Sequence, residues 1–98
     1  MSKENLKSLR SKIDKIDNDL LKLIQKRAAL AVSIGKIKSK ISPNTSFNKP
    51  DREATILRNI LKANEKGALS NEKVRTIYKE LISGCLSLEE ALRISYLG

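Results

Sequence analysis

The fold is decided by residues 5–41, which read NLKSLRSKIDKIDNDLLKLIQKRAALAVSIGKIKSKI. Apolar residues recur in this stretch at alternating spacings of three and four, with one interruption, and this spacing places them on one face of an α-helix. The sequence therefore predicts a single long amphipathic helix. Its apolar residues are Leu6, Leu9, Ile13, Ile16, Leu20, Leu23, Leu30, Ile34, Ile37 and Ile41.

The length of this helix predicts a second copy of the chain. At 1.5 Å per residue the helix spans roughly 54 Å, whereas a compact globule of about 100 residues is only roughly 34 Å across. One chain cannot cover an apolar face of that length. We therefore expect an obligate homodimer in which the uncovered part packs across a two-fold axis.

Two shorter helices are expected after a loop over residues 42–46. Pro50 suits the first turn of the second helix, which is predicted to run to about Asn64 and to be ended by Gly67. Ser70 suits the start of the third helix. The expected fold class is all-α, with a long, a short and a medium helix in each chain. The apolar stripe of the third helix comprises Val74, Ile77, Leu81, Cys85, Leu88 and Leu92.

Composition limits the chemistry that one chain can perform. A length of 98 residues suits a single domain. Because the chain has no histidine and only one cysteine, Cys85, it cannot form a disulfide, a Cys/His metal site or a Ser/His nucleophilic pair. The net charge of +9 indicates an anionic partner. The N-terminus lacks the apolar stretch of a secretory signal, so we expect a cytoplasmic protein.

Arg27 interrupts the apolar stripe of the long helix, between Leu23 and Leu30. A guanidinium in an apolar seam costs several kcal/mol unless an anion meets it. Lys38 lies 11 residues further on, on the same face. Ala31 and Gly35 lie between the two cations, and their small size either leaves space for a bound anion or admits a neighbouring helix while the cations reach solvent. Both interpretations are open.

The other candidate residues are weaker when each is taken alone. Arg10 lies roughly 25 Å from Arg27 along the helix, so only a second subunit could bring the two together. Arg52 and Glu53 fall in the first turn of the second helix, where a glutamate also satisfies helix polarity. Cys85 and Glu89 are four residues apart on the third helix and could equally serve packing.

In combination, the order and spacing of several segments resemble the all-helical chorismate mutase family, over nearly the whole chain. In that family three helices per chain interlock into a dimer with two equivalent sites. The segments that carry the resemblance are Leu9–Asp17, Leu20–Arg27, Gly35–Lys38, Asp51–Glu53 and Leu81–Glu89.

The resemblance implies a role for each candidate residue. Arg27 and the partner subunit's Arg10 would hold the two carboxylates of chorismate, and Lys38 would donate to the ether oxygen of the breaking bond. Glu53 would bind the ring hydroxyl, and Arg52 would support the charge of the site. No metal or cofactor is expected, because the conversion of chorismate to prephenate is intramolecular.

Two positions depart from the pattern of the family's bacterial members. Lys49 stands where an acidic residue is common, and Cys85 stands where a serine is common. Glu89 occupies a position that is glutamine in some members and glutamate in others. Cys85 and Glu89 are expected to contact the substrate, but only a protonated glutamate can donate to the ether oxygen.

The last residues, Arg93–Gly98, are similar to the opening of a prephenate dehydratase domain, which begins with a strand. We therefore expect a chorismate mutase domain over residues 1–94, with residues 95–98 leading into a dehydratase domain of a bifunctional enzyme. The implied pathway is aromatic amino acid biosynthesis.

Two other functions stay open at this point. One is an isochorismate pyruvate-lyase of the same fold, and the other is a non-enzymatic basic helical dimer that binds nucleic acid. The preferred interpretation has chorismate as a dianionic substrate and requires neither nucleic acid nor membrane.

Overall fold

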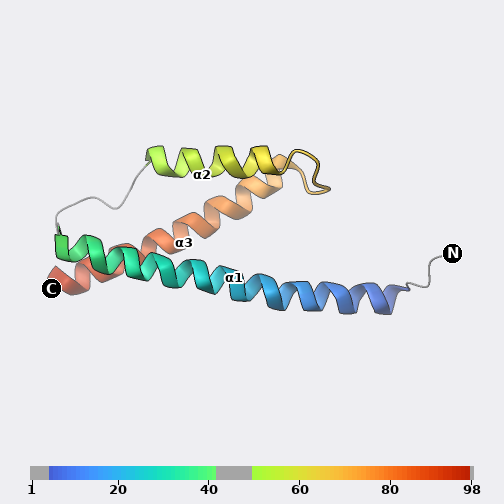
Figure 1. Ribbon diagram of the computed structural model, residues 1–98, viewed down its shortest axis with the longest axis horizontal. Coiled ribbons are helices and arrows are strands. Elements are labelled where there is room, and N and C mark those ends of the chain that lie inside the picture. Colours follow the sequence, from blue (N-terminus) through green and yellow to red (C-terminus); the bar gives the residue numbers. More distant parts are fainter. Residues whose placement is uncertain (1–4, 42–49, 98) are drawn as a thin grey trace.

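The computed structural model describes residues 5–41 and 50–97, and these residues form three helices (Figure 1). Helix α1 spans Leu6–Ile41, α2 spans Pro50–Ala63 and α3 spans Asn71–Leu97. No strand occurs within the described ranges. The all-α prediction and the long, short and medium helix order are therefore confirmed. The expected loop over residues 42–46, and Lys49, lie outside the described residues.

Polar side chains fix where α1 and α3 begin. The Asn5 side-chain oxygen accepts a hydrogen bond from the backbone N–H of Ser8 at 2.8 Å. The Ser70 hydroxyl accepts one from the backbone N–H of Lys73 at 3.2 Å. Each bond satisfies a donor that the first turn of a helix leaves without an intrahelical partner. The predicted start of the third helix at Ser70 is confirmed.

The turn between α2 and α3 is closed by Asn64 rather than by Gly67. The Asn64 side-chain amide donates to the Leu69 carbonyl at 3.0 Å and to the Asn71 side-chain oxygen at 2.8 Å. Among the described residues no glycine has a positive φ, so Gly67 does not act as a left-handed helix cap. Its backbone N–H instead donates to the Asn64 carbonyl at 3.0 Å. A Cβ at Gly67 would collide with the Asn64 side chain.

Helix α3 continues beyond the expected domain boundary after Ile94. Its last turn extends to Leu97, so Ser95–Leu97 are helical. The expected boundary between residues 94 and 95 stays a prediction.

Helix α3 packs against both other helices and holds the fold together. Ala31, Gly35 and Ser39 are buried on α1 and follow one another at intervals of four, which places them on a single face. Ile82 and Cys85 are buried on α3. Because α1 packs on α3 and not on α2, we infer that this stripe of small residues is where α3 approaches. The interpretation of Gly35 as a point of helix approach is thus supported.

Most of the apolar face of α1 is uncovered in a single chain. The molecule is elongated, with extents of 61 × 24 × 15 Å, and α1 extends well past α2 and α3 (Figure 1). Ten large apolar side chains of α1 are 44–66% exposed: Leu6, Leu9, Ile13, Ile16, Leu20, Leu21, Leu23, Leu30, Ile34 and Ile37. Such a surface is far more apolar than a monomer normally presents to water.

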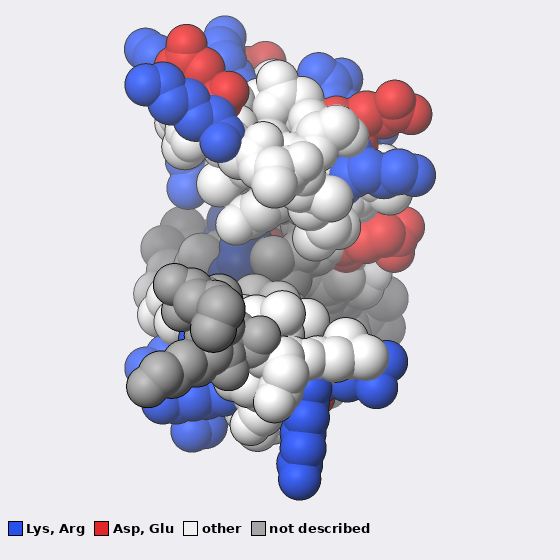
Figure 2. All heavy atoms as spheres, turned by 90° about the vertical axis from the view of Figure 1, so that its right-hand side faces the viewer, with Lys and Arg blue, Asp and Glu red and all other residues white. Residues whose placement is uncertain are grey.

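Charge is distributed unevenly over the three helices. Ten of the basic residues and three acidic ones lie on α1, whereas α3 has four of each. In a view from the N-terminal side of α1, most charged side chains along the lower edge, over α1, are basic (Figure 2). Basic and acidic side chains are mixed at the opposite edge, over α2 and its turn into α3. None of the described helices combines the length and the apolar character that crossing a bilayer requires.

Candidate active site

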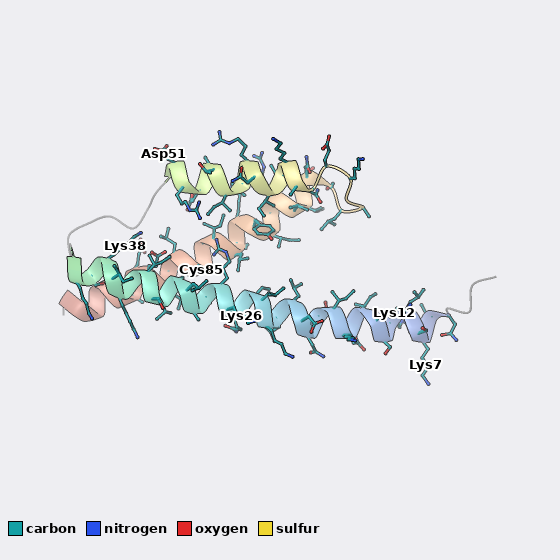
Figure 3. All side chains as sticks on the ribbon, in the orientation of Figure 1. Lys7, Lys12, Lys26, Lys38, Asp51 and Cys85 are labelled. Atoms are coloured by element: carbon teal, nitrogen blue, oxygen red, sulfur yellow. The ribbon has the colours of Figure 1, made fainter. Side chains whose placement is uncertain are left out.

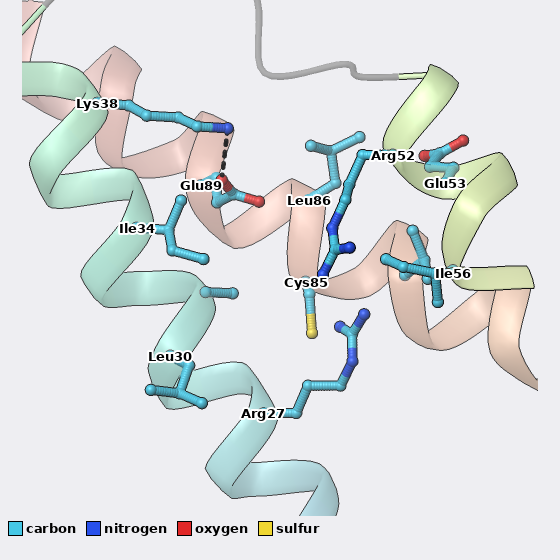
Figure 4. A pocket seen from close by; sticks show the side chains of 12 residues that line it. Arg27, Leu30, Ile34, Lys38, Arg52, Glu53, Ile56, Cys85, Leu86 and Glu89 are labelled. Carbon is cyan, nitrogen blue, oxygen red and sulfur yellow. Dashed lines mark hydrogen bonds and ion pairs between the residues drawn. The ribbon is translucent and has the colours of Figure 1, made fainter. Parts of the chain in front are cut away.

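A pocket of about 490 Å³ lies where the three helices meet. The C-terminal half of α1, the first turns of α2 and the middle of α3 form its walls (Figure 4). It combines five charged side chains with an apolar lining. The lining residues are Arg27, Leu30, Ala31, Ile34, Lys38, Arg52, Glu53, Ile56, Ile82, Cys85, Leu86 and Glu89.

Helix α1 supplies Arg27 and Lys38 to the same pocket. Eleven residues are close to three full turns, so one helix face presents both cations about 16 Å apart along the axis. Both residues are half-buried. Ala31 lines the pocket between them, whereas Gly35 is buried and does not line it. The space predicted at these small residues is therefore present at Ala31 only.

Lys38 is paired with Glu89 across the pocket. The Lys38 Nζ donates to the Glu89 Oε1 at 3.3 Å, which joins α1 to α3 (Figure 4). The side chains are 29% and 12% exposed, respectively. Partial burial makes such a pair stronger than one on an open surface, because solvent screens it less. Glu89 thus holds the Lys38 ammonium at the pocket.

Helix α2 contributes Arg52 and Glu53 from its first turn. The Arg52 side chain extends from α2 across the pocket toward α3 (Figure 4). Taken alone, the two residues suggested only helix polarity, but both line the pocket. Their helix packs on α3 and has no backbone contact with α1, so α3 determines how Arg52 faces the α1 cations.

Cys85 lies at the floor of the pocket on α3. It is 6% exposed and projects from α3 into the pocket, one turn before Glu89 (Figure 4). The apolar walls of the pocket are formed by Leu30, Ile34, Ile56, Ile82 and Leu86. None of these residues was predicted to belong to the site. Periodicity places Leu30 and Ile34 on the apolar face of α1 but does not distinguish pocket lining from core.

Arg10 lies away from the pocket, and of the candidate residues it alone does so. It is exposed and lines a separate open groove at the N-terminal end of α1 with Leu6, Lys7, Ser11 and Asp14. Around this groove the side chains of α1 project into open space (Figure 3). The distance of roughly 25 Å to Arg27 along the helix rules out a shared site within one chain.

Comparisons with known proteins identify the family. The chain is 45% identical to a bifunctional chorismate mutase/prephenate dehydratase from Aquifex aeolicus over 98 aligned positions, which cover 97% of this chain and 26% of that protein. It is 40% identical to the protein of the same name from Stutzerimonas stutzeri, covering 97% of this chain and 27% of that one.

A shorter relative matches as well. The chain is 42% identical to a chorismate mutase from Methanocaldococcus jannaschii over 59 positions, which cover 60% of this chain and 58% of that protein. The chain thus spans about a quarter of the length of the bifunctional relatives that it matches. Residues 9–90 match the family described as chorismate mutase type II. The chain therefore belongs to the chorismate mutase type II family.

Proposed function

We propose that this chain is a chorismate mutase, which converts chorismate to prephenate. The observation that carries the proposal is that Arg27, Lys38 and Arg52 line one pocket with apolar walls. Its volume of about 490 Å³ lies within the usual range for small-molecule sites. Three cations in such a pocket suit a small dicarboxylate with an apolar ring.

The reaction needs positioning and charge, both of which the pocket supplies. A C–O bond breaks as a C–C bond forms within one molecule, so neither a nucleophile nor a cofactor is required. The site must hold the substrate in a compact conformation and stabilise the negative charge that develops on the ether oxygen. Apolar walls from all three helices exclude water around the ring.

Each polar residue has a role in this proposal. Arg27 binds one substrate carboxylate, which accepts hydrogen bonds from the guanidinium. Lys38 donates to the ether oxygen and moves toward it from Glu89. Glu53 accepts a hydrogen bond from the ring hydroxyl, and Arg52 adds positive charge. Glu89 in its protonated form is a second donor to the ether oxygen.

A second subunit completes the site in this proposal. With Glu89 ionised, the pocket of one chain has three cations and two carboxylates, a net charge of +1, whereas chorismate is a dianion. The partner subunit's Arg10 would raise the charge to +2 and bind the second carboxylate. The exposed apolar face of α1 supports a homodimer, since a second copy would cover it. Arg10 lies on the uncovered half of that helix.

The proposal is tested by the loss of chorismate absorbance with the purified chain. We expect turnover that Arg27→Ala reduces at least about 10²-fold, the cost of removing one charge-stabilising donor from an active site. Lys26→Ala is the matched control, because Lys26 is the adjacent exposed cation and does not line the pocket. The proposal fails if the folded wild-type dimer leaves chorismate unchanged.

A further inference from the structure

Seven of the chain's nine net positive charges lie on α1, where ten basic residues face three acidic ones. Arg27 and Lys38 account for two of the ten and line the pocket. The remaining excess of positive charge lies on the surface of the helix. Five exposed lysines outside the pocket define what we call the lysine ridge: Lys15, Lys22, Lys26, Lys36 and Lys40.

The lysine ridge follows one side of α1. At 100° per residue its five positions fall within a sector of about 80°, and they extend over about 37 Å of the axis. No acidic residue of α1 falls inside this sector. Within residues 5–41 and 50–97 none of the five lysines forms an ion pair. Asp19 is a helix neighbour of Lys15 and Lys22, but it is 17 residues before Lys36, so no carboxylate of α1 lies close to Lys36 or Lys40.

Lys36 and Lys40 lie behind the pocket. Each is two residues from Lys38, and two residues correspond to 200° around the helix, so both project from the opposite side of α1. With side chains a helix is about 10–12 Å thick, which is close to one Debye length at 0.1 M salt. Their field reaches a ligand in the pocket although they do not touch it.

We propose that the lysine ridge, through Lys36 and Lys40 above all, raises the affinity of the site for dianions by long-range attraction. This inference rests on the proposed function, and it assigns to surface lysines a share of substrate binding. The field should act on substrate, transition state and product alike, because the rearrangement leaves both carboxylates in place. Uniform binding of this kind lowers KM and leaves kcat unchanged.

The experiment measures kcat and KM for chorismate at 10 mM and 100 mM salt, in the wild type and in the double variant Lys36→Gln/Lys40→Gln. Two unit charges, each about 12 Å from a dianion, predict that their removal raises KM about fivefold at 10 mM and about twofold at 100 mM. The inhibition constant of the product should rise by the same factors. Glutamine and lysine have similar helix propensities, so the fold is retained.

Two matched variants separate charge at this place from other effects. Lys36→Arg/Lys40→Arg keeps the charge and should keep the wild-type KM. Lys66→Gln/Lys73→Gln removes two exposed lysines near the α2–α3 turn; Lys73 is 12 residues, about 18 Å, from Cys85 along α3. We expect this pair to leave KM unchanged at 100 mM salt. Thermal stability is measured beside the kinetics, because Lys40 also lies in the last turn of α1 and favours its dipole.

The outcomes distinguish the two proposals. Absence of chorismate turnover in the wild type at both salt concentrations removes the proposed function itself. Turnover with a KM that the ridge variant leaves unchanged at 10 mM overturns the role of the lysine ridge. A fall in kcat in the ridge variant would also overturn it. An equal rise in KM in the Lys66→Gln/Lys73→Gln control would do the same.

Discussion

The two halves of α1 follow the same apolar pattern and yet have different surroundings. In the C-terminal half, Ala31, Gly35 and Ser39 are buried, and Arg27 and Lys38 line the pocket. In the N-terminal half, none of the described residues 6–23 is buried. Periodicity thus identifies which face of a helix must be covered. Whether the same chain can cover that face depends on how far its other helices extend along it.

Breaking the apolar stripe in the N-terminal half should have the largest effect. Leu20 is 50% exposed in the single chain, and we expect it to lie in the dimer interface. Leu20→Glu would place a charge there at a cost of several kcal/mol. We predict loss of the dimer by analytical ultracentrifugation and loss of chorismate turnover.

Gln25→Glu is the control for that substitution, because Gln25 is exposed on the polar side of the same helix and the added charge is equal. The Gln25→Glu protein should remain a dimer. A Leu20→Glu protein that stays dimeric would show that this half of α1 is not the interface.

Removing the Lys38 ammonium group, in the C-terminal half of α1, should have the next largest effect. We predict that Lys38→Ala lowers kcat about 10²- to 10³-fold, since the donor aimed at the developing oxygen charge is lost. The dimer should persist. Lys40→Ala, two residues away and outside the pocket, should retain nearly the wild-type kcat. Similar losses in both variants would mean that general positive charge, not the position of Lys38, supports the reaction.

Much of the fold follows from local chemistry that can be read in the sequence. The spacing of apolar residues predicts α1, and Pro50 and Ser70 mark where α2 and α3 begin because proline suits a first turn and serine caps one. The end of α2 is less well predicted by the sequence. Gly67 is the expected helix terminator, but the hydrogen bonds that close the turn come from Asn64, whose side-chain amide donates to two residues of the following segment.

The site was only partly accessible to the same reasoning. Arg27 and Lys38 could be paired because both lie on one helix, where the separation along the axis is fixed. Arg52, Glu53, Cys85 and Glu89 come from other helices, and spacing along the chain does not determine how helices pack. The resemblance to the chorismate mutase family singled them out, and the structure places all four in the pocket with Arg27 and Lys38.

The seam between α1 and α3 offers a test with a moderate effect on stability. Gly35 is buried on the stripe that faces α3. Gly35→Leu would overfill this seam and should lower the free energy of unfolding by about 1–3 kcal/mol, measured by urea denaturation. Ala29→Leu adds a comparable side chain at an exposed position of the same helix and should change stability by less than about 0.5 kcal/mol. Equal effects would argue against close packing at Gly35.

The smallest expected effect concerns the ion pair across the pocket. Glu89 accepts from Lys38 as a carboxylate, whereas the side-chain amide of a glutamine can also donate to the substrate ether oxygen. We predict that Glu89→Gln retains the wild-type kcat or raises it, measured by the loss of chorismate absorbance. Glu89→Ala has neither a donor nor an acceptor at this position and should lower kcat. An equal loss of kcat in both variants would remove the donor role of this position.

The central claim is that each active site combines the C-terminal half of one α1 with the N-terminal half of another. It is tested most directly by mixing two inactive proteins, Arg10→Ala and Arg27→Ala, after dissociation and reassembly. In a mixed dimer one site would contain an intact Arg27 from one subunit and an intact Arg10 from its partner. Random pairing of equal amounts should restore about a quarter of the wild-type turnover. A mixture that forms mixed dimers and remains inactive would contradict the account.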